Sequence, residues 1–375
     1  MRISSVAIFT AELPLAQPFE HASSGRIDRL EEVVVKVATT AGAEGWAEVR
    51  GNAPYVTGES QGRVVATLVD TLVPRLMLAP ETSPAEFGRF LDAIVPGNVT
   101  AKAALETALH DAWAREMDMP LARLLGAGTI RGVKVHATLP FCPPEEAAQR
   151  ASVYLDHGIR TIKVRVGLRP FDRDLARLEA VAGAVARHPA GAEVRLATDT
   201  NQGWSVKEAV RALRRLEGFE LSWAEQPVAG HDLAGLREVR EESLMPVIAD
   251  ESCGTPEDLL RIIAMRAADG VHLKLVKAGG VRRLLAMTAI AEAASVPYLV
   301  GQMDEGTLAT AAALHCAAVA EPLSCELWGF QRVGSQPFSA LRMRDGRVDL
   351  PDGPGLGIQV DEGALHLVRR FEAAA

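Results

Sequence analysis

The segment Val194-Arg195-Leu196-Ala197-Thr198-Asp199 decides the fold, because it is an apolar run that ends in an acid and its pattern recurs. The next two occurrences are Leu221-Ser222-Trp223-Ala224-Glu225 and Val247-Ile248-Ala249-Asp250. The acids follow one another at intervals of about 25 residues, roughly the length of one strand, one helix and two loops. This spacing predicts parallel strands joined by helices, with the three acids at neighbouring strand ends.

Lysines occupy two similar segments on either side of the acids. Lys163 lies in Thr161-Ile162-Lys163-Val164-Arg165-Val166, and Lys274 lies in Val271-His272-Leu273-Lys274-Leu275. If these segments are also strands of a closed barrel, the five side chains converge at its C-terminal mouth, where barrel active sites lie. Three carboxylates between two lysines indicate a divalent-metal site with a candidate acid/base group on each flank.

The alternation of strand and helix continues over most of the chain. Strands are expected at 133–139, 161–166, 194–199, 221–225, 247–250, 271–275, 297–301 and 324–327, with at least seven helices between them. A doubly wound open sheet is the competing architecture, but units of near-equal length favour a closed barrel. The predicted fold class is therefore α/β, a TIM-type (β/α) barrel.

The first part of the chain has a different pattern. Strands are expected at 3–10, 32–37 and 45–49, with a hairpin turn at 39–43, and helices at 60–76, 84–94 and 100–117. This order indicates an α+β unit. We expect an N-terminal domain over residues 1–128, the barrel over 129–330, and a C-terminal segment over 331–375 that returns to pack on the N-terminal domain.

Composition narrows the class of protein. The 375 residues carry a formal net charge of -8, which argues against a nucleic-acid partner or an anionic membrane surface. The N-terminus lacks the apolar core of a signal peptide, and no apolar run approaches a membrane span. The four cysteines form no Cys-x-x-Cys pair and are expected to be reduced thiols. We expect a soluble cytoplasmic protein.

Carboxylates at barrel strand ends have several uses. Any one of Asp199, Glu225 and Asp250 could instead cap the following helix, but three in succession favour a metal site. Oxygen ligands suit Mg²⁺, with Mn²⁺ as an alternative. No histidine is expected at these three strand ends, which argues against zinc.

The basic residues also have two interpretations each. Lys163 and Lys274 could act as acid/base groups beside a cation, or could form structural ion pairs with the acids. Arg165 follows Lys163 by two residues and so projects to the same face of the strand. It is expected to be a poor base and suited to holding a carboxylate or an oxyanion.

Several weaker candidates for substrate contact lie near predicted strand ends or in polar loops: His21, Arg26, Asn201, Asp304, Glu305 and Glu326. The stretch around His21 and Arg26 would either cover the barrel mouth or be a solvated loop. Asn201 could instead be a turn residue without a role in binding, and Asp304 and Glu305 could instead cap the next helix. The histidines at helix or strand positions are expected to be structural: His110, His136, His272 and His315.

Taken together, these motifs resemble the enolase superfamily, in its muconate-lactonizing and mandelate-racemase-like branches. The resemblance covers nearly the whole chain. Outside the barrel it rests on Val56-Thr57-Gly58-Glu59, on the helix that begins Ala101-Lys102-Ala103-Ala104, and on Pro120-Leu121-Ala122-Arg123-Leu124-Leu125-Gly126. In the barrel it rests on Lys163-Val164-Arg165, Asp199-Thr200-Asn201, Glu225-Gln226-Pro227, Ala249-Asp250-Glu251-Ser252 and Lys274-Leu275-Val276-Lys277-Ala278-Gly279-Gly280.

The resemblance implies a capping α+β domain over a modified (β/α)7β barrel. It implies Mg²⁺ held by Asp199, Glu225 and Asp250, a small carboxylate substrate, and a homo-oligomer. The shared reaction step is removal of the proton α to a carboxylate, which gives an enolate that the metal stabilises. Lys274 matches the lysine of the sixth barrel strand.

Arg165 departs from the family pattern, whose lysine branch carries Lys-x-Lys on the second barrel strand. Because Lys274 is then the only ordinary base, a one-base reaction, cycloisomerisation or dehydration, is ranked above racemisation or epimerisation. Cys325-Glu326-Leu327-Trp328-Gly329 also resembles the strand-eight stretch of muconate cycloisomerases, and the Asp-x-Asp of dipeptide epimerases is absent there. A non-catalytic metal-binding relative and a Schiff-base aldolase using Lys274 are further alternatives.

Overall fold

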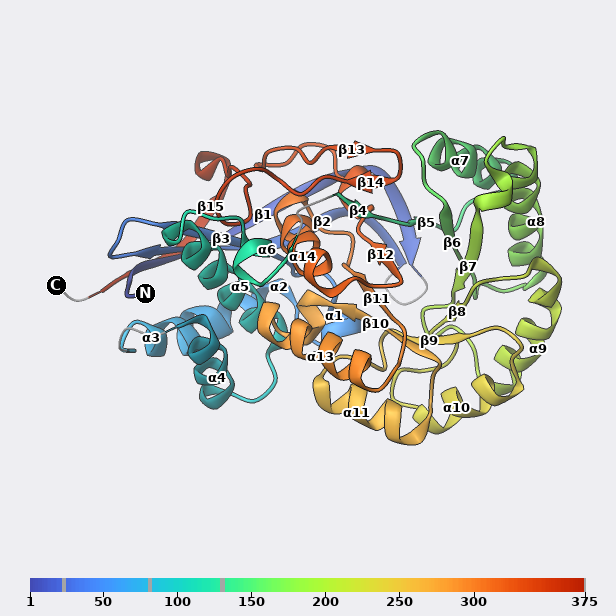
Figure 1. Ribbon diagram of the computed structural model, residues 1–375, viewed down its shortest axis with the longest axis horizontal. Helices are drawn as coiled ribbons and strands as arrows, with labels where there is room; N and C mark the ends of the chain where they lie inside the picture. Colours follow the sequence, from blue (N-terminus) through green and yellow to red (C-terminus); the bar gives the residue numbers. More distant parts are fainter. Residues whose placement is uncertain (22–24, 80–82, 129–131, 374–375) are drawn as a thin grey trace.

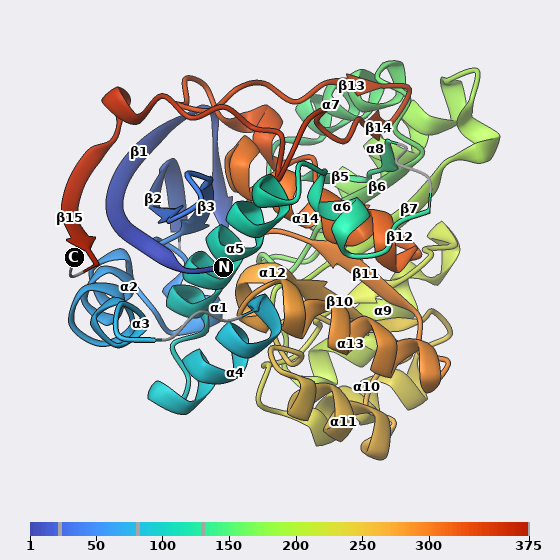
Figure 2. The same ribbon diagram turned by 60° about the vertical axis from the view of Figure 1, so that its left-hand side comes forward.

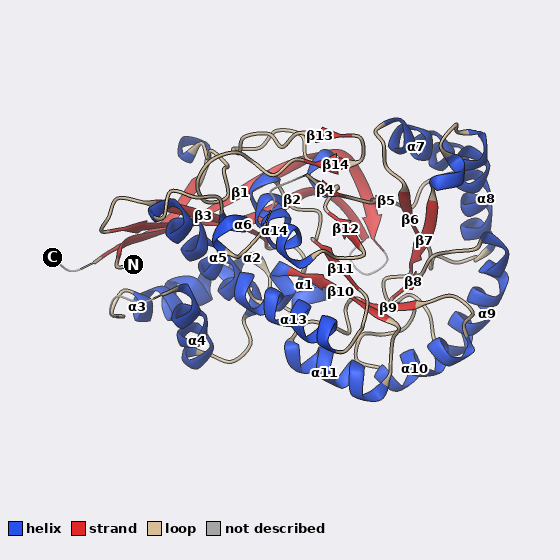
Figure 3. Ribbon diagram, in the orientation of Figure 1, coloured by secondary structure: helices blue, strands red, loops and turns tan. Residues whose placement is uncertain are grey.

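The computed structural model describes residues 1–21, 25–79, 83–128 and 132–373. A barrel of parallel strands ringed by helices lies beside an antiparallel sheet with its own helices (Figure 1). In the barrel the strands lie inside and the helices outside, and in the cap the helices lie beside the sheet (Figure 3). The α/β barrel with an N-terminal α+β capping domain is thus confirmed. The domain limits at residues 128 and 330 stay predictions.

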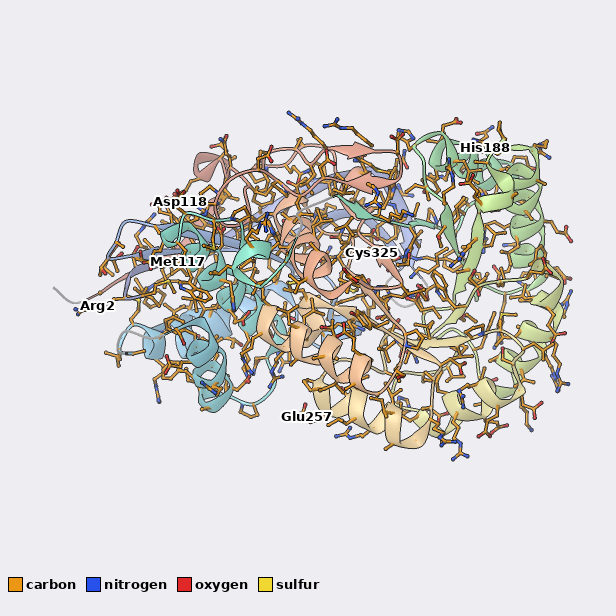
Figure 4. The ribbon with its side chains drawn as sticks, viewed as in Figure 1. Arg2, Met117, Asp118, His188, Glu257 and Cys325 are labelled. Atoms are coloured by element: carbon orange, nitrogen blue, oxygen red, sulfur yellow. The ribbon has the colours of Figure 1, made fainter. Side chains whose placement is uncertain are left out.

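The barrel strands follow one another in chain order around the sheet, β5 to β12. They are β5 (Ala137–Leu139), β6 (Thr161–Arg165), β7 (Arg195–Asp199), β8 (Ala224–Glu225), β9 (Val247–Ala249), β10 (Gly270–Lys274), β11 (Tyr298–Gly301) and β12 (Ser324–Glu326). The first and last strands approach each other, since the amide of His136 donates to the carbonyl of Cys325 at 2.8 Å. Cys325 is labelled on β12 in Figure 4.

One long helix follows each of the first seven strands. These are α7 (Pro144–Asp156), α8 (Asp172–Arg187), α9 (Val206–Leu216), α10 (Leu233–Glu242), α11 (Pro256–Met265), α13 (Val281–Ala293) and α14 (Thr307–Ala320). Short turns lie between them: η2 (Gly191–Glu193), η3 (Glu217–Phe219) and the one-turn α12 (Leu275–Ala278). Strand β12 is followed by the short η4 (Gly329–Arg332), so the described chain has the (β/α)7β arrangement.

The capping domain is built on a four-stranded antiparallel sheet in the order β15-β1-β2-β3. Its strands are β1 (Ile3–His21), β2 (Gly25–Thr39), β3 (Glu44–Arg50) and, from the C-terminal segment, β15 (His366–Glu372). Figure 2 shows β15 running along β1 at the outer edge of this sheet. Strand β1 is longer than the expected 3–10, because its pairing with β2 continues to His21 and Gly25.

The helices of the capping domain lie against this sheet and the barrel. They are α1 (Pro54–Thr57), α2 (Gln61–Thr67), η1 (Leu68–Leu72), α3 (Val73–Leu76), α4 (Pro84–Ile94), α5 (Val99–Glu116) and α6 (Leu121–Leu124). The single helix expected over 60–76 is interrupted by the π-helical turn η1. Pro74 lies just after this turn and cannot donate to the α-helical ladder, which accounts for the interruption.

The strand expected over 133–139 is divided in two. Only β5 belongs to the barrel. The preceding β4 (Val133–Lys134) pairs with β14 (Arg347–Val348), which pairs with β13 (Met343–Arg344). The η5 turn (Glu362–Ala364) leads into β15. The C-terminal segment therefore contacts both the barrel and the cap.

Two buried acids of the cap fasten it to the barrel. The Glu106 carboxylate accepts hydrogen bonds from the amides of Val281 and Arg282, at 2.6 and 3.1 Å, at the start of α13. The Glu48 carboxylate accepts from Gly306 and Ala309, at 2.8 and 3.0 Å, at the start of α14. Each acid thus satisfies amides that have no partner within their own helix.

Two expectations from composition can be compared with the structure. All four cysteines lie in the described chain and are unpaired, with Cys142 half-buried and the others buried. Within the described ranges, every helix is too short or too polar to cross a bilayer.

Candidate active site

The three acids lie side by side at the C-terminal ends of adjacent barrel strands. Asp199 ends β7 and pairs in register with Glu225, which ends β8, while Asp250 immediately follows β9. All three side chains are buried. The convergence predicted from the spacing of the acids is therefore what the fold produces.

Lys163 lies at the centre of this cluster. Its Nζ is 2.8 Å from Glu225 Oε1, 3.2 Å from Asp199 Oδ2 and 3.0 Å from Glu326 Oε1. The side chain exposes no surface and is among the largest completely buried side chains of the protein. Lys163 is thus an internal counter-ion for the acids, below the mouth of the barrel.

Lys274 lies on the other flank, at the end of β10. Its Nζ donates to Asp250 Oδ2 at 2.7 Å and is 3.8 Å from Glu326 Oε2. Nζ of Lys277, in α12, also donates to Asp250, both to its carboxylate and to its backbone carbonyl. Asp250 therefore holds two ammonium groups.

Burial and neighbouring charges together shift the pKa values of these groups. Burial would lower the pKa of Lys274, but the carboxylates of Asp250 and Glu326 raise it above its ordinary value. Burial would raise the pKa of Glu225, but Lys163 and His272 lower it to about 2. Burial raises the pKa of Asp199 to about 6, and the nearby carboxylates of Glu225 and Glu326 contribute to the rise. The ammonium groups therefore stabilise the ionised acids unequally.

The strand ends are held in place by two amide side chains. Asn201 donates to both carboxylate oxygens of Asp199, from its backbone at 2.9 Å and from Nδ2 at 3.2 Å. Gln226 Oε1 accepts from the amides of Asp250 and Ser252, at 2.9 and 3.1 Å. Both Asn201 and Gln226 have positive φ, at 46° and 35°, so the chain turns sharply after β7 and β8. This geometry orients the acids toward one another.

Arg165 ends β6, on the side of the acids opposite to Lys274. Its Nη2 is 3.8 Å from Asp304 Oδ2, whereas Arg332 donates to both oxygens of Asp304 at 2.9 and 3.0 Å. Phe19 of the cap lies over both guanidinium groups, 5.1 Å from Arg165 and 5.4 Å from Arg332. In the described chain, Nε and Nη1 of Arg165 are buried without a hydrogen-bond partner.

A small cavity of about 20 Å³ joins these groups, large enough for about one water. The barrel and the cap both line it, the latter through Arg50, Tyr55 and Val56. The barrel residues that line it are Arg165, Asp199, Asn201, Asp250, Glu251, Lys274, Gln302, Met303, Asp304 and Glu326. A molecule larger than a water therefore fits here only if the side chains that line the cavity move.

The candidate substrate residues from the sequence do not all reach this cavity. Asn201, Asp304 and Glu326 line it. Arg26 is exposed on β2, and Glu305 is buried with its Oε2 accepting from the Met303 amide at 3.3 Å, away from the lining. The backbone of His21 ends β1, and its side chain lies outside the described part of the structure.

The three strand ends that carry the acids contain no histidine, as expected, but a histidine from β10 lies beside them. Nδ1 of His272 lies 2.8 Å from Glu225 Oε1, and the ring is completely buried inside the barrel. His272 precedes Lys274 by two residues and so faces the same side of β10, a signal that the sequence did contain. Phe19 and Arg50 were also missed, because they lie in the cap, and Arg332 was missed because no pattern marks it in the segment after β12.

The donor set fits a hard divalent cation. Glu225, Asp250 and His272 offer atoms within 4.8 Å of one another, and Asp199 is linked to Glu225 through Lys163. Two further oxygens of the cavity lining, Asn201 Oδ1 and Glu251 Oε2, are buried without a partner among the described residues. The carboxylate and amide oxygens suit Mg²⁺, whereas Nδ1 of His272 already lies within hydrogen-bond distance of Glu225 Oε1.

Two family models match the chain. The description "Mandelate racemase / muconate lactonizing enzyme, N-terminal domain" covers residues 3–126, and "Enolase C-terminal domain-like" covers residues 145–364. Together they cover most of the cap and every barrel strand except β5.

Three known proteins illustrate the range of relatives. The L-Ala-D/L-Glu epimerase of Bacillus subtilis is 33% identical over 96% of this chain and 97% of its own. A substrate-liganded structure of that epimerase has a TM-score of 0.88 and covers 96% of this chain and 99% of its own. The chloromuconate cycloisomerase CbnB of Cupriavidus necator is 30% identical over the full length of both chains. A dipeptide epimerase from Cytophaga hutchinsonii, solved with Mg and D-Ala-L-Val, has a TM-score of 0.89 at 27% identity and covers 100% of both chains.

Proposed function

The chain belongs to the enolase superfamily, in its mandelate racemase and muconate lactonizing branch, and on this premise we propose that it is a Mg²⁺-dependent isomerase that removes the α-proton of a small carboxylate substrate. One observation carries the proposal. The strands of Asp199, Glu225 and Asp250 lie between the strand of Arg165 and the strand of Lys274, and all but Glu225 line one cavity. A substrate held at the acids is therefore flanked by a cationic side chain on each side.

Asp199, Glu225 and Asp250 are the proposed metal ligands. A bound Mg²⁺ supplies charge neutralisation for the enolate that forms when the α-proton leaves. The unpartnered oxygens of Asn201 and Glu251 would complete the polar surroundings of the cation.

Lys274 is the proposed base, accepting the α-proton at Nζ. Its ion pair with Asp250 favours the protonated ammonium, so the base form requires that the carboxylate charge be neutralised. A ligated Asp250 meets this condition. Asn201 and Gln226 contribute by fixing the acids, which keeps Lys274 aligned with them.

Racemisation or epimerisation is the proposed reaction within this class. Arg165 lies opposite Lys274 with two buried nitrogens, Nε and Nη1, that have no partner among the described residues, and there it can donate a proton to the second face of the enolate. The two epimerases reported above support this assignment. The ranking of one-base chemistry first, which the sequence favoured, is not the one that the relatives favour.

Cycloisomerisation is the second candidate. It is favoured by Arg165, which is a poor proton acceptor, and by Glu326, which lines the cavity next to Lys274. The cycloisomerase relative is 30% identical over the whole chain. This reaction needs proton transfer on one face only.

Proton exchange in D₂O separates the candidates. The Mg²⁺-loaded protein is incubated with L-Ala-L-Glu, with an N-acylamino acid and with cis,cis-muconate, and the α-hydrogen is followed by proton NMR. Inversion with deuterium at the α-carbon supports epimerisation, and lactone formation supports cycloisomerisation. Chelation should abolish either reaction, and added Mg²⁺ should restore it.

The matched variants are Lys274→Ala and Lys207→Ala, since Lys207 is an exposed lysine on α9. Loss of a general base lowers the rate by about 100-fold or more. The Lys207 variant should keep its activity. Undiminished exchange in Lys274→Ala, or activity that persists after chelation, would refute the proposal.

A further inference from the structure

Arg50 brings a buried positive charge from the cap to the cavity. It is the last residue of β3, is 2% exposed, and lines the same cavity as Arg165 and Lys274. A buried guanidinium is costly unless its charge and its N–H groups are matched by partners. The partners of Arg50 therefore indicate what it is for.

Two of the three guanidinium nitrogens are held by neutral groups. Nε donates to Asn52 Oδ1 at 2.8 Å, and Nη1 donates to the backbone carbonyl of Met303 in the barrel. Nη2 is buried and has no acceptor within the residues that the structure describes. These two hydrogen bonds fix the orientation of the Arg50 side chain and leave Nη2 without an acceptor among the described residues.

The acids near Arg50 do not form a close ion pair with it. Glu32, the register partner of Arg50 across β2 and β3, and Glu305 are close enough to interact with its charge, but no ion pair joins Arg50 to any described acid within 4.0 Å. Burial raises the pKa of Glu48 to about 8, and burial with the charge of Glu48 raises the pKa of Glu32 well above its ordinary value. Burial therefore disfavours the ionised forms of Glu32 and Glu48, the forms that would neutralise Arg50.

The acids of the cavity lining are also committed elsewhere. Asp304 binds Arg332 through both oxygens, and Glu326 pairs with Lys163. The carboxylates at the metal end are assigned to the cation. The end of the cavity nearest the cap therefore presents a positive charge that lacks an anion.

We propose that Arg50 is a specificity-determining residue that binds a second carboxylate of the substrate, remote from the carboxylate at the metal site. The substrate class is accordingly a dianion, such as an acyl or side chain that ends in a carboxylate. This inference rests on the proposed function only for the position of the first carboxylate.

A purely structural role for Arg50 makes a different prediction. If Arg50 serves only to connect β3 to Met303, its removal lowers the thermal stability and weakens the binding of all ligands equally. If Arg50 binds a second carboxylate of the substrate, its removal selectively weakens the binding of dianions. The comparison of charged and neutral ligands of equal size distinguishes the two roles.

The test measures binding, so that it does not depend on turnover. Calorimetric titrations of the full-length, Mg²⁺-loaded protein use succinate, glutarate and adipate, each paired with its monoamide, as probes. For the dicarboxylate of matching length we expect about tenfold tighter binding than for its monoamide, as for a hydrogen bond to a charged group. In Arg50→Gln this ratio should fall to about one, and in Arg63→Gln, an exposed arginine of the same cap, it should be retained.

Every outcome decides the proposal. A ratio near one for all three pairs in the unmodified protein overturns it, as does an unchanged ratio in Arg50→Gln. Arg50→Lys, which keeps the charge, guards against misfolding and should retain part of the preference. A preference that depends on Arg50 in a protein without metal-dependent proton exchange would support this inference while refuting the proposed reaction.

Discussion

Nζ of Lys163 donates to Oε1 of Glu225 at 2.8 Å, and neither side chain exposes any surface. Because Lys163 also contacts Asp199 and Glu326, it neutralises a cluster that would otherwise repel itself. Removing one partner of a buried ion pair costs about 3–5 kcal/mol. We therefore expect Lys163→Met to unfold at lower temperature than the unmodified protein when metal is absent.

Mg²⁺ should recover part of this loss, since a cation bound at the acids replaces the missing charge. The increase in Tm on adding Mg²⁺ should be larger for Lys163→Met than for the unmodified protein, measured by calorimetry with and without chelator. Lys207→Met, on the surface of α9, is the control. An equal increase in Tm for Lys163→Met and for the unmodified protein would show that Lys163 and the cation do not interact with the same acids.

Glu106 supports a prediction about how the two domains stay together. Its carboxylate accepts from the amides of Val281 and Arg282, so that a cap residue closes the first turn of a barrel helix. Glu106→Gln retains one acceptor oxygen and loses the other, at a cost of about 1–3 kcal/mol. Urea unfolding should show this loss, whereas Glu238→Gln, exposed on α10, should be within about 0.5 kcal/mol of the unmodified protein. Equal stability of the two variants would contradict a fastening role for Glu106.

The barrel and its acids could be predicted from the sequence because both depend on local order. A strand that ends in Asp199, followed by a helix and another strand ending in Glu225, places the acids together whatever the rest of the chain does. The alternation of side chains along a strand also places Arg165 above Lys163, and it could have placed His272 below Lys274.

The cap side of the site could not be predicted in this way. Phe19 reaches Arg165 only because the β1–β2 pair extends to the barrel, and Arg50 reaches Met303 across more than 250 positions of sequence. No periodicity relates such residues. Glu305 illustrates the converse, since its place after β11 suggested substrate contact, but the packing of the cap buries it outside the lining.

Glu32 gives a prediction about pH. Its carboxyl is completely buried, both oxygens are without partners among the described residues, and burial raises its pKa well above the ordinary value of 4.5. The folded chain then binds more protons than the unfolded chain above about pH 4.5, so the stability falls as pH rises toward the folded pKa. Glu48, with a pKa of about 8, acts in the same direction.

Glu32→Gln replaces the titrating carboxyl of Glu32 with a neutral amide and removes no hydrogen bond. We expect its Tm to equal that of the unmodified protein near pH 5 and to exceed it by roughly 2 °C or more at pH 9. Thermal unfolding from pH 5 to pH 9 is the measurement, and Glu31→Gln, at a partly exposed neighbouring position, is the control. Parallel pH curves for all three proteins would show that Glu32 is ionised in the folded state.

In the proposed reaction, Arg165 makes the two faces of the enolate differ. Lys274 can take a proton, rotate and return a deuteron to the same face, so the enantiomer whose α-hydrogen faces Lys274 should exchange in D₂O without inverting. The other enantiomer presents its hydrogen to Arg165, which accepts a proton poorly. Deuterium wash-in to the unreacted substrate should therefore be strongly asymmetric between the two enantiomers.

Arg165→Lys should reduce this asymmetry by at least about tenfold, because a lysine on that face can act as an ordinary base. Arg165→Gln is the matched variant without a proton donor, and it should lose inversion while keeping the wash-in on the Lys274 face. Proton NMR of each pure enantiomer in D₂O reports both quantities. If wash-in is already symmetric in the unmodified protein, Arg165 is itself an effective base. If Arg165→Gln still inverts the substrate, the proton on that face comes from another group.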